Sequence, residues 1–263
     1  MGQFESYEQS YGKSDEGAQM INSIGQKATV PFTLLDKHSP YHPNKRGKEL
    51  ERFGQSDFQA HLEIFLDILS EGKPYPVQVY QGDDLATALL RSLACHRQLL
   101  TSEDADWEAT DVMWAEQTGL ARRQIDRVRQ SLLEEGCLKY QRRGFPASSY
   151  YRYQIPLDRQ EPIICFPYWP GLSEYIGYKP AALFCWLADL DKQFEAQGYF
   201  FHLKMADIQQ SLGLSRYQVD QARKKLIEHD LLKERFWGIP AVREFRLRLD
   251  GLEQLVAEKG ASK

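Results

Sequence analysis

The chain has 263 residues, enough for two domains with cores of their own, and its 42% hydrophobic and 27% charged residues are ordinary for a globular protein. No apolar run approaches the roughly 18 residues needed to span a bilayer, and the first residues lack the apolar core of a secretory signal. The net charge of −4 argues against nonspecific binding to nucleic acid.

The cysteines and histidines do not form a recognisable site. The four cysteines are scattered without a CxxC pair, and the six histidines are equally dispersed. This pattern excludes the usual zinc motifs and favours reduced thiols, so we expect a cytoplasmic protein without metal or cofactor. The sequence has neither a glycine-rich phosphate loop nor a nucleophile elbow. We therefore assign no catalytic residue and do not expect an enzyme.

Polar residues dominate the first 46 positions, for which we expect a flexible arm (residues 1–46) with a short strand at Ala28–Leu35. Apolar residues at helical spacing then predict an amphipathic helix from about Lys48 to Ser70. Gly72-Lys73-Pro74 ends this helix. A second helix is predicted from about Asp83 to Leu100.

A short helix at Thr110–Thr118, a turn at Gly119-Leu120 and a longer helix at Ala121–Glu135 follow. Apolar residues of the longer helix stand at i, i+3, i+7 and i+8, a spacing that buries one stripe. They are Ile125, Val128, Leu132 and Leu133. Two alternating segments around the turn GFPAS predict a β-hairpin. These elements define a first domain at residues 47–155.

The segment Gly119–Ile155 is repeated without a gap at Gly213–Leu249, with 14 identities over 37 aligned positions. Two copies indicate two similar modules in tandem. A linker at residues 156–179 separates the first domain from a second at residues 180–263. The second domain is predicted to contain helices at Pro180–Phe194, Met205–Leu212 and Ser215–His229, a tight return at Gly198–Phe201, a hairpin, and a fraying helix at residues 251–263.

Positive charge is concentrated in the repeated segment. Thr101–Thr118 carries six acids and no base, a net charge of −6. Gly119–Ile155 carries eight bases and three acids (+5), and Gly213–Leu249 carries nine bases and five acids (+4). A local basic patch is a better indicator of nucleic-acid binding than the net charge of the chain.

A short helix, a glycine turn, a second helix and a two-stranded ribbon follow one another in both copies, around GLARRQIDRVRQSLLEEGCLKYQRRG and GLSRYQVDQARKKLIEHDLLKERFWGIP. Over roughly Asp83–Ile155 and Pro180–Leu249 this order resembles the winged helix-turn-helix modules of phage and plasmid replication proteins and of many prokaryotic regulators. The resemblance implies an α+β, mainly α fold with two winged helix-turn-helix domains in tandem. In such modules the second helix enters the major groove, and the ribbon touches phosphates or the minor groove.

The resemblance places DNA-binding residues on the second helix and the ribbon of each module. Arginine can bond guanine and glutamine can bond adenine, whereas phosphate contacts fix only the register. In the first module we expect base contacts from Arg122, Arg123, Gln124, Arg127 and Gln130, and phosphate contacts from Arg129, Lys139, Arg142 and Arg143. In the second module the corresponding residues are Arg216, Tyr217, Gln218, Gln221, Arg223, Lys224 and Lys225, with Arg235 and Arg243 on the ribbon.

Two features do not fit simple phosphate binding. Asp126 and Asp220 occupy equivalent positions, where each can pair with Arg122 or Arg216 four residues earlier or accept a cytosine amine; the pairing is the simpler interpretation. Phe236-Trp237 at the tip of the second ribbon indicates a protein contact, with the other module or with a partner.

We therefore expect a protein that binds duplex DNA sequence-specifically, in plasmid- or phage-type replication initiation or in transcriptional regulation, and that is associated with the nucleoid or a plasmid. A second copy of the chain and a replication or condensin-like protein are further candidate partners. The alternative is a tandem winged-helix scaffold of a chromosome-condensing or mobile-element complex. The net charge and Phe236-Trp237 favour the scaffold, whereas the two basic helices favour DNA.

Overall fold

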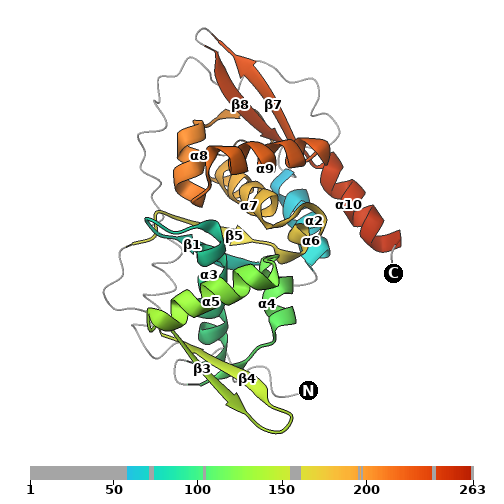
Figure 1. Ribbon diagram of the computed structural model, residues 1–263. Helices are drawn as coiled ribbons and strands as arrows, with labels where there is room; N and C mark the ends of the chain where they lie inside the picture. Colours follow the sequence, from blue (N-terminus) through green and yellow to red (C-terminus); the bar gives the residue numbers. More distant parts are fainter. Residues whose placement is uncertain are drawn as a thin grey trace, which may run out of the picture.

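The computed structural model describes residues 58–70, 74–102, 105–154, 161–194, 196, 198–238 and 241–261. The expected arm at residues 1–46, with its strand, and the beginning of the helix predicted from Lys48 lie outside this part of the chain. The described residues form an α+β fold in which helices predominate and the sheets are small and antiparallel (Figure 1).

The first half of the described chain runs from α2 to β4. It contains the predicted helices and the predicted hairpin, together with two strands that were not predicted, β1 and β2. The elements are α2 (Phe58–Ser70), β1 (Tyr75–Val79), α3 (Leu85–Thr101), β2 (Trp107–Glu108), α4 (Asp111–Thr118), α5 (Arg122–Glu134), β3 (Leu138–Arg143) and β4 (Ser148–Tyr153).

The second half runs from β5 to α10 and again contains the predicted helices and hairpin. Three further elements, β5, α6 and β6, were not predicted. The elements are β5 (Ile164–Tyr168), α6 (Pro170–Ile176), α7 (Tyr178–Gln193), β6 (Phe201–His202), α8 (Met205–Leu212), α9 (Arg216–Glu228), β7 (Leu232–Trp237), β8 (Val242–Leu247) and α10 (Asp250–Ala261).

The repeat in the sequence is also a repeat of structure. The elements β2, α4, α5, β3 and β4 have the same bounds as β6, α8, α9, β7 and β8 after a displacement of 94 positions. We call α3–β4 the first repeat and α7–β8 the second repeat. The same local signals shape both, because α4 and α8 each end at a left-handed glycine: Gly119, with φ of 71°, and Gly213, with φ of 58°.

Each repeat is completed by a three-stranded antiparallel sheet, ordered β2-β4-β3 or β6-β8-β7. The hairpins pair in the same register, from Leu138↔Tyr153 in the first repeat and from Leu232↔Leu247 in the second. The two-residue strands β2 and β6 are too short to leave an alternating pattern in the sequence. In β2 the buried Trp107 ring packs edge-on against another core side chain.

The two repeats are joined by β1 and β5. These strands pair antiparallel with Val77 opposite Phe166 at the centre, and both side chains are buried. The next helix, α6, lies against α2 and α4. The hydroxyl of Tyr168 donates a hydrogen bond to the carbonyl oxygen of Thr118 in the first repeat, at 3.0 Å. The segment expected as a linker, residues 156–179, therefore carries a strand and a helix that hold the two repeats together.

Candidate nucleic-acid interface

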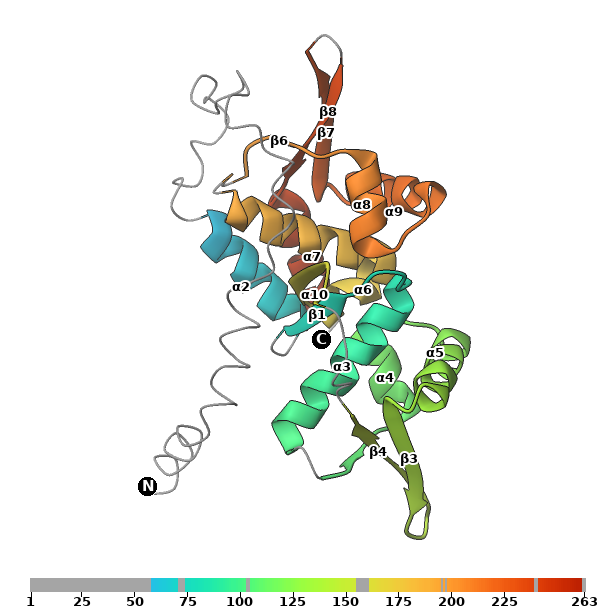
Figure 2. The ribbon, with the colours of Figure 1, turned by 90° about the vertical axis from the view of Figure 1, so that its left-hand side faces the viewer.

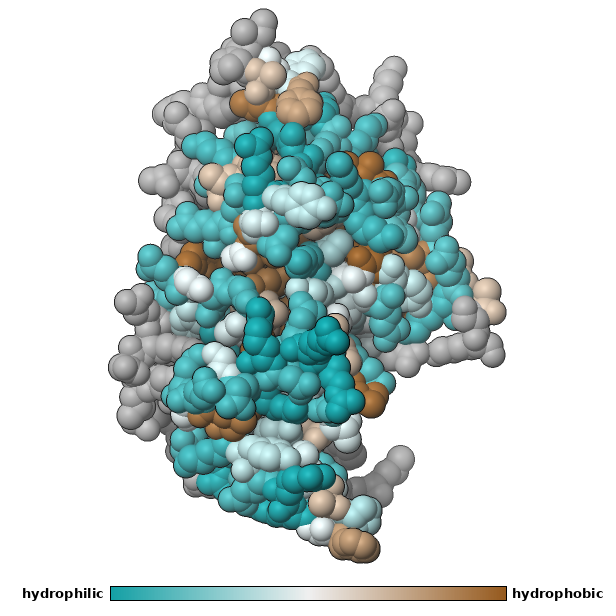
Figure 3. Space-filling view, viewed as in Figure 1, coloured by the Kyte–Doolittle hydropathy of each residue, from teal (hydrophilic) through white to brown (hydrophobic). Residues whose placement is uncertain are grey.

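α5 and α9 lie on the same side of the molecule. In Figure 1 both helices face the viewer, with the hairpin β3–β4 at the bottom and the hairpin β7–β8 at the top. The view turned by 90° places α5 and α9 on the right and α2 on the left (Figure 2). The space-filling view shows that hydrophilic residues cover most of this surface (Figure 3). We call it the α5/α9 face.

On α5, helical periodicity separates the buried stripe from two exposed arginines. Arg122 is 79% exposed, and its nearest carboxylate, that of Asp111, lies 3.5 Å away. Arg123 is exposed and has no ion-pair partner among the residues that the structure describes. An exposed pair at this distance contributes little free energy. Both guanidinium groups are therefore available to an anionic or hydrogen-bonding ligand.

A third arginine of α5 is held by an exposed ion pair. Arg127 donates to the carboxylate of Asp84 at 2.7 Å, and Asp84 is also the N-cap of α3. Burial raises the pKa of Asp84, but the hydrogen bonds from Thr87 and the charge of Arg127 outweigh it and hold the pKa below its usual value. Since both side chains are about half exposed, Arg127 can exchange this partner for a ligand at small cost.

α9 presents a comparable but chemically different set of side chains. Arg216, Gln221 and Lys224 are exposed, and no carboxylate of the described residues forms an ion pair with Arg216 or Lys224. Tyr217 is 72% exposed, which is unusual for an aromatic ring on a helix without a function. Lys225 is partly exposed beside them. The second repeat therefore also exposes cationic and hydrogen-bonding groups on the α5/α9 face.

Gln124 and Gln218, the equivalent glutamines that were expected to contact bases, instead cap the N-termini of α5 and α9. The side-chain oxygen of Gln124 accepts from the backbone N–H of Ala121 at 3.1 Å, and that of Gln218 accepts from Ser215 at 2.9 Å. Gln124 also donates to the hydroxyl of Tyr178 at 2.8 Å. These two glutamines start their helices, which explains why they are identical in both repeats. Farther along α5, Gln130 is exposed and donates to Glu134.

Arg129 and Arg223, expected to contact phosphates, are placed within the fold. Arg129 donates to Asp111 at 2.8 Å and to the hydroxyl of Tyr151 at 3.0 Å. The side chain of Arg223 is only 9% exposed and pairs with Glu234 on β7. Each arginine fixes the second helix of its repeat to a neighbouring element. A phosphate could reach neither guanidinium without breaking these bonds.

The recurring aspartates pair with the arginines that follow them. Asp126 bonds Arg129 at 2.6 Å, and Asp220 bonds Arg223 at 2.5 Å, each three residues later. The expected pairing with Arg122 or Arg216, four residues earlier, is wrong. The later arginines are held close by additional partners on the sheet or on α4, whereas the earlier ones point to solvent.

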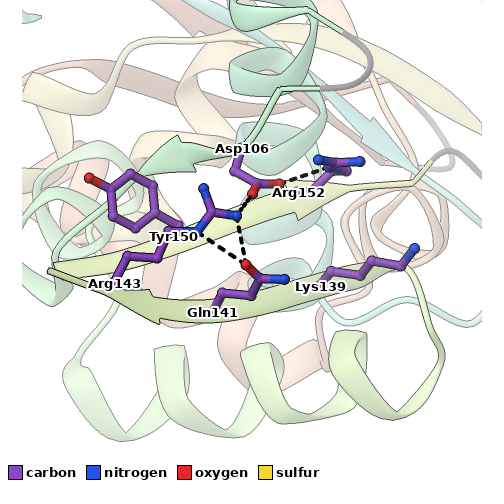
Figure 4. A pocket seen from close by; sticks show the side chains of 6 residues that line it. All are labelled: Asp106, Lys139, Gln141, Arg143, Tyr150 and Arg152. Carbon is purple, nitrogen blue, oxygen red and sulfur yellow. Dashed lines mark hydrogen bonds and ion pairs between the residues drawn. The ribbon is translucent and has the colours of Figure 1, made fainter. Parts of the chain in front are cut away.

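In the hairpin of the first repeat, two of the four cations are paired with a carboxylate and two are not. Lys139 and Arg142 are exposed, whereas Arg143 and Arg152 both pair with Asp106, the latter at 2.8 Å. Figure 4 shows Asp106 between the two guanidinium groups. These arginines hold the pKa of Asp106 below its usual value. They line a hollow of about 200 Å³ with Asp106, Lys139, Gln141 and Tyr150.

The hairpin of the second repeat carries arginines stacked on aromatic rings. Arg235 lies 3.9 Å from the ring centre of Phe200 and pairs with Glu244 at 2.6 Å. Arg243 lies 4.9 Å from the ring centre of Phe236, which is 63% exposed. The guanidinium of Arg235 also lies 5.4 Å from the ring centre of Trp237. The second hairpin therefore offers a more apolar surface than the first.

One exposed side chain was missed by the sequence analysis. Phe145, at the tip of the β3–β4 hairpin, is as exposed as in an extended chain. The sequence suggested only turn chemistry for Gly144-Phe145-Pro146. A large apolar side chain between two turn-forming residues was the available signal, since neither neighbour can cover it. Phe145 stands next to the cations of the first hairpin and extends the surface that a ligand would meet.

No protein-family model matches the chain, and no curated protein matches it. Within the described ranges, no helix is long and apolar enough to cross a membrane. The same ranges contain no group of three or more His, Cys, Asp or Glu side chains that could hold a metal ion.

Proposed function

We propose that the two repeats are winged helix-turn-helix modules and that the chain binds duplex DNA sequence-specifically. In this proposal α5 and α9 enter the major groove, and the hairpins β3–β4 and β7–β8 are the wings. Initiation of plasmid- or phage-type replication and regulation of transcription are the two roles that this activity would serve. The protein would act in the cytoplasm, on nucleoid or plasmid DNA.

One observation carries the proposal: two equivalent helices expose cationic side chains on the same side of the molecule. Arg123 on α5 and Arg216 and Lys224 on α9 have no ion-pair partner among the described residues, and Arg122 has only an exposed one, Asp111 at 3.5 Å. Exposed cations are common on any protein surface because they increase solubility. Solubility alone would not require them on both equivalent helices of one face, nor the identical pair Arg122 and Arg216 at equivalent positions. A duplex offers phosphates and base edges along one line, which this arrangement matches.

The wings support the proposal at the ends of the α5/α9 face. Arg142 is exposed and free of ion pairs in the described structure, so it can bind a phosphate. Phe145 lies beyond it at the hairpin tip. Apolar side chains at such positions can enter the minor groove between base steps. The first wing therefore combines a phosphate contact with an apolar groove contact.

Substitutions on α5 and on the first wing should have different effects. Arg123→Ala should weaken binding to a preferred duplex by roughly 1–3 kcal/mol and relax the preference at one base pair, because it removes a base contact. Arg142→Ala should weaken preferred and unrelated duplexes about equally, because phosphates are the same in both. Fluorescence anisotropy titrations with a selected and a scrambled duplex measure both effects. Equal changes in selectivity would refute the division between helix and wing.

A second candidate function, a protein scaffold, is favoured by Phe236. The ring of Phe236 is exposed on β7. The equivalent residue of the first repeat, on β3, is Arg142. An aromatic ring flanked by an arginine is typical of the centre of a protein interface. The scaffold would be preferred if the chain binds no genomic duplex at about 50 mM salt, where phosphate contacts are strong.

A further inference from the structure

We infer that the duplex recognised by this chain is an imperfect inverted repeat, with a dyad between the segments bound by α5 and α9. The inference rests on the proposed function and adds the symmetry of the DNA site. Three features of the fold show that the two repeats are related by an approximate twofold rotation. The differences between the two helix faces then make the arms of the site unlike.

The first feature is the strand pair that joins the repeats. β1 precedes the first repeat and β5 precedes the second, and the two strands pair antiparallel from Tyr75↔Tyr168 to Val79↔Ile164. The two strands are not 94 positions apart, because α6 stands between β5 and α7, but each precedes the first helix of a repeat. Two strands that pair antiparallel are exchanged by a local twofold axis through the centre of their ladder. Here that centre is the pair Val77↔Phe166.

The second feature is a reciprocal contact between the repeats. A Cβ atom placed on Gly119 would overlap the side chain of Ser173 on α6 and would lie 3.2 Å from the Cβ of Tyr178, at the start of α7. A Cβ atom placed on Gly213 would lie 3.2 Å from the Cα of Asp84, at the start of α3. Tyr178 and Asp84 are themselves equivalent, 94 positions apart. Each glycine turn therefore contacts the start of the first helix of the other repeat, as expected at a twofold interface, and Gly119 additionally packs on α6, which has no counterpart between β1 and α3.

The third feature is the direction of the axis. In Figure 1, α5 and α9 both face the viewer, α4 and α8 lie on opposite flanks, and the two hairpins point to opposite ends. Figure 2 confirms that α5 and α9 share one side. A rotation that exchanges these elements has its axis perpendicular to the α5/α9 face. A translation along the molecule would instead point both hairpins in the same direction.

B-form DNA has twofold axes perpendicular to its length. A protein with its own twofold axis perpendicular to the binding face presents equivalent side chains to opposite strands, and its site is an inverted repeat. With α5 and α9 in successive major grooves, the arms would be centred about 10 base pairs apart. Head-to-tail modules would require a direct repeat instead.

The arms are unlike because the exposed residues of the two helices differ. Arg122 and Arg216 are equivalent and identical, so they favour the same base at one position of each arm. Arg123 is replaced by Tyr217, and Arg127 by Gln221. Arginine favours guanine and glutamine favours adenine, so the arms diverge at these positions. By contrast, the turn glycine and the buried Leu120, Leu132 and Leu138 are identical in the second repeat.

The orientation of the modules can be mapped by tethered cleavage. Ala147 and Ala241 are equivalent, exposed alanines of the two hairpin turns, so each can be replaced by cysteine and linked to an iron–EDTA reagent. Burial raises the pKa of Cys165 to about 11 and of Cys185 to about 12, which slows their labelling. As a control, the unsubstituted chain is treated with the same reagent, so that any cuts caused by labelling of the native cysteines can be identified.

The full-length chain is first used to select duplexes from a random library. On the selected duplex, Ala147→Cys and Ala241→Cys should cut at opposite outer ends of the protected region. A cut from either position between the two arms would overturn the inference while leaving DNA binding intact. If no duplex is selected, the proposed function fails, and the inference fails with it.

A change of specificity tests the same inference through the bases. Tyr217→Arg combined with Gln221→Arg gives α9 the two arginines that α5 carries at the equivalent positions, Arg123 and Arg127. This variant should prefer a palindrome made of two inverted copies of the first arm over the original site, by roughly 5- to 150-fold for each base pair corrected. The control duplex carries the two copies as a direct repeat with the same spacing. Preference for the direct repeat would overturn the inference.

Discussion

Gly213→Ala should destabilise the folded chain by about 2–5 kcal/mol. The left-handed backbone at this turn costs a residue with a Cβ roughly 1–2 kcal/mol. In addition, the new Cβ would overlap the backbone carbonyl of Asp83, and overpacking of this kind costs roughly 1–3 kcal/mol. The backbone at the start of α3 cannot rotate away as a flexible side chain could. Unfolding by urea, followed by circular dichroism, measures the loss.

Gly136→Ala is the matched control for this prediction. Gly136 also has a positive φ, of 71°, but no atom lies within 4 Å of the position that its Cβ would take. The Gly136→Ala variant should therefore be destabilised only by the backbone strain of a Cβ at positive φ, roughly 1–2 kcal/mol. If the two variants lose the same free energy of unfolding within about 0.5 kcal/mol, the two repeats are not packed at this turn.

Arg223→Ala should destabilise the protein by about 3–5 kcal/mol. Its guanidinium is almost fully buried between Asp220 and Glu234, and removing it leaves the carboxylate of Glu234 largely buried without its cation. Lys224→Ala, one position away on the exposed side of α9, should change the free energy of unfolding by less than about 0.5 kcal/mol. Thermal or urea unfolding of both variants tests the pair.

The same two variants separate folding from ligand contact. At a temperature where both are folded, Lys224→Ala should weaken DNA binding more than Arg223→Ala. If Arg223→Ala instead lost DNA binding with unchanged stability, Arg223 would be a DNA contact, as the sequence analysis expected. It would also mean that the ion pair with Glu234 contributes nothing to the fold.

The sequence predicted the repeated core of the fold because its signals are local. Helical spacing of Ile125, Val128 and Leu132 and the two glycine turns place α4, α5, α8 and α9 within one or two residues of their observed ends. The strands β1 and β5 were missed because their pairing joins Val77 to Phe166, far away in the chain. Neither segment alternates polar and apolar residues clearly enough to predict a strand by itself.

The candidate site was predicted less completely than the fold. The exposed faces of α5 and α9 follow from helical periodicity, so Arg123 and Tyr217 lie where they were expected. Arg129 and Arg223 look like further cations of a basic segment, and only their distant partners reveal that they hold the fold together. Their identity in both repeats was a signal, since the retained residues are mainly those that build the module.

The account depends most directly on salt-dependent binding of duplex DNA by the full-length chain. Anisotropy titrations of genomic fragments at several salt concentrations should give a plot of log K against log salt with a slope near −5, as expected if about six phosphates are neutralised. Neutralising Arg123, Arg142 and Arg216 together should make the slope markedly shallower. An absence of binding to every fragment at about 50 mM salt, or binding independent of salt, would contradict the account.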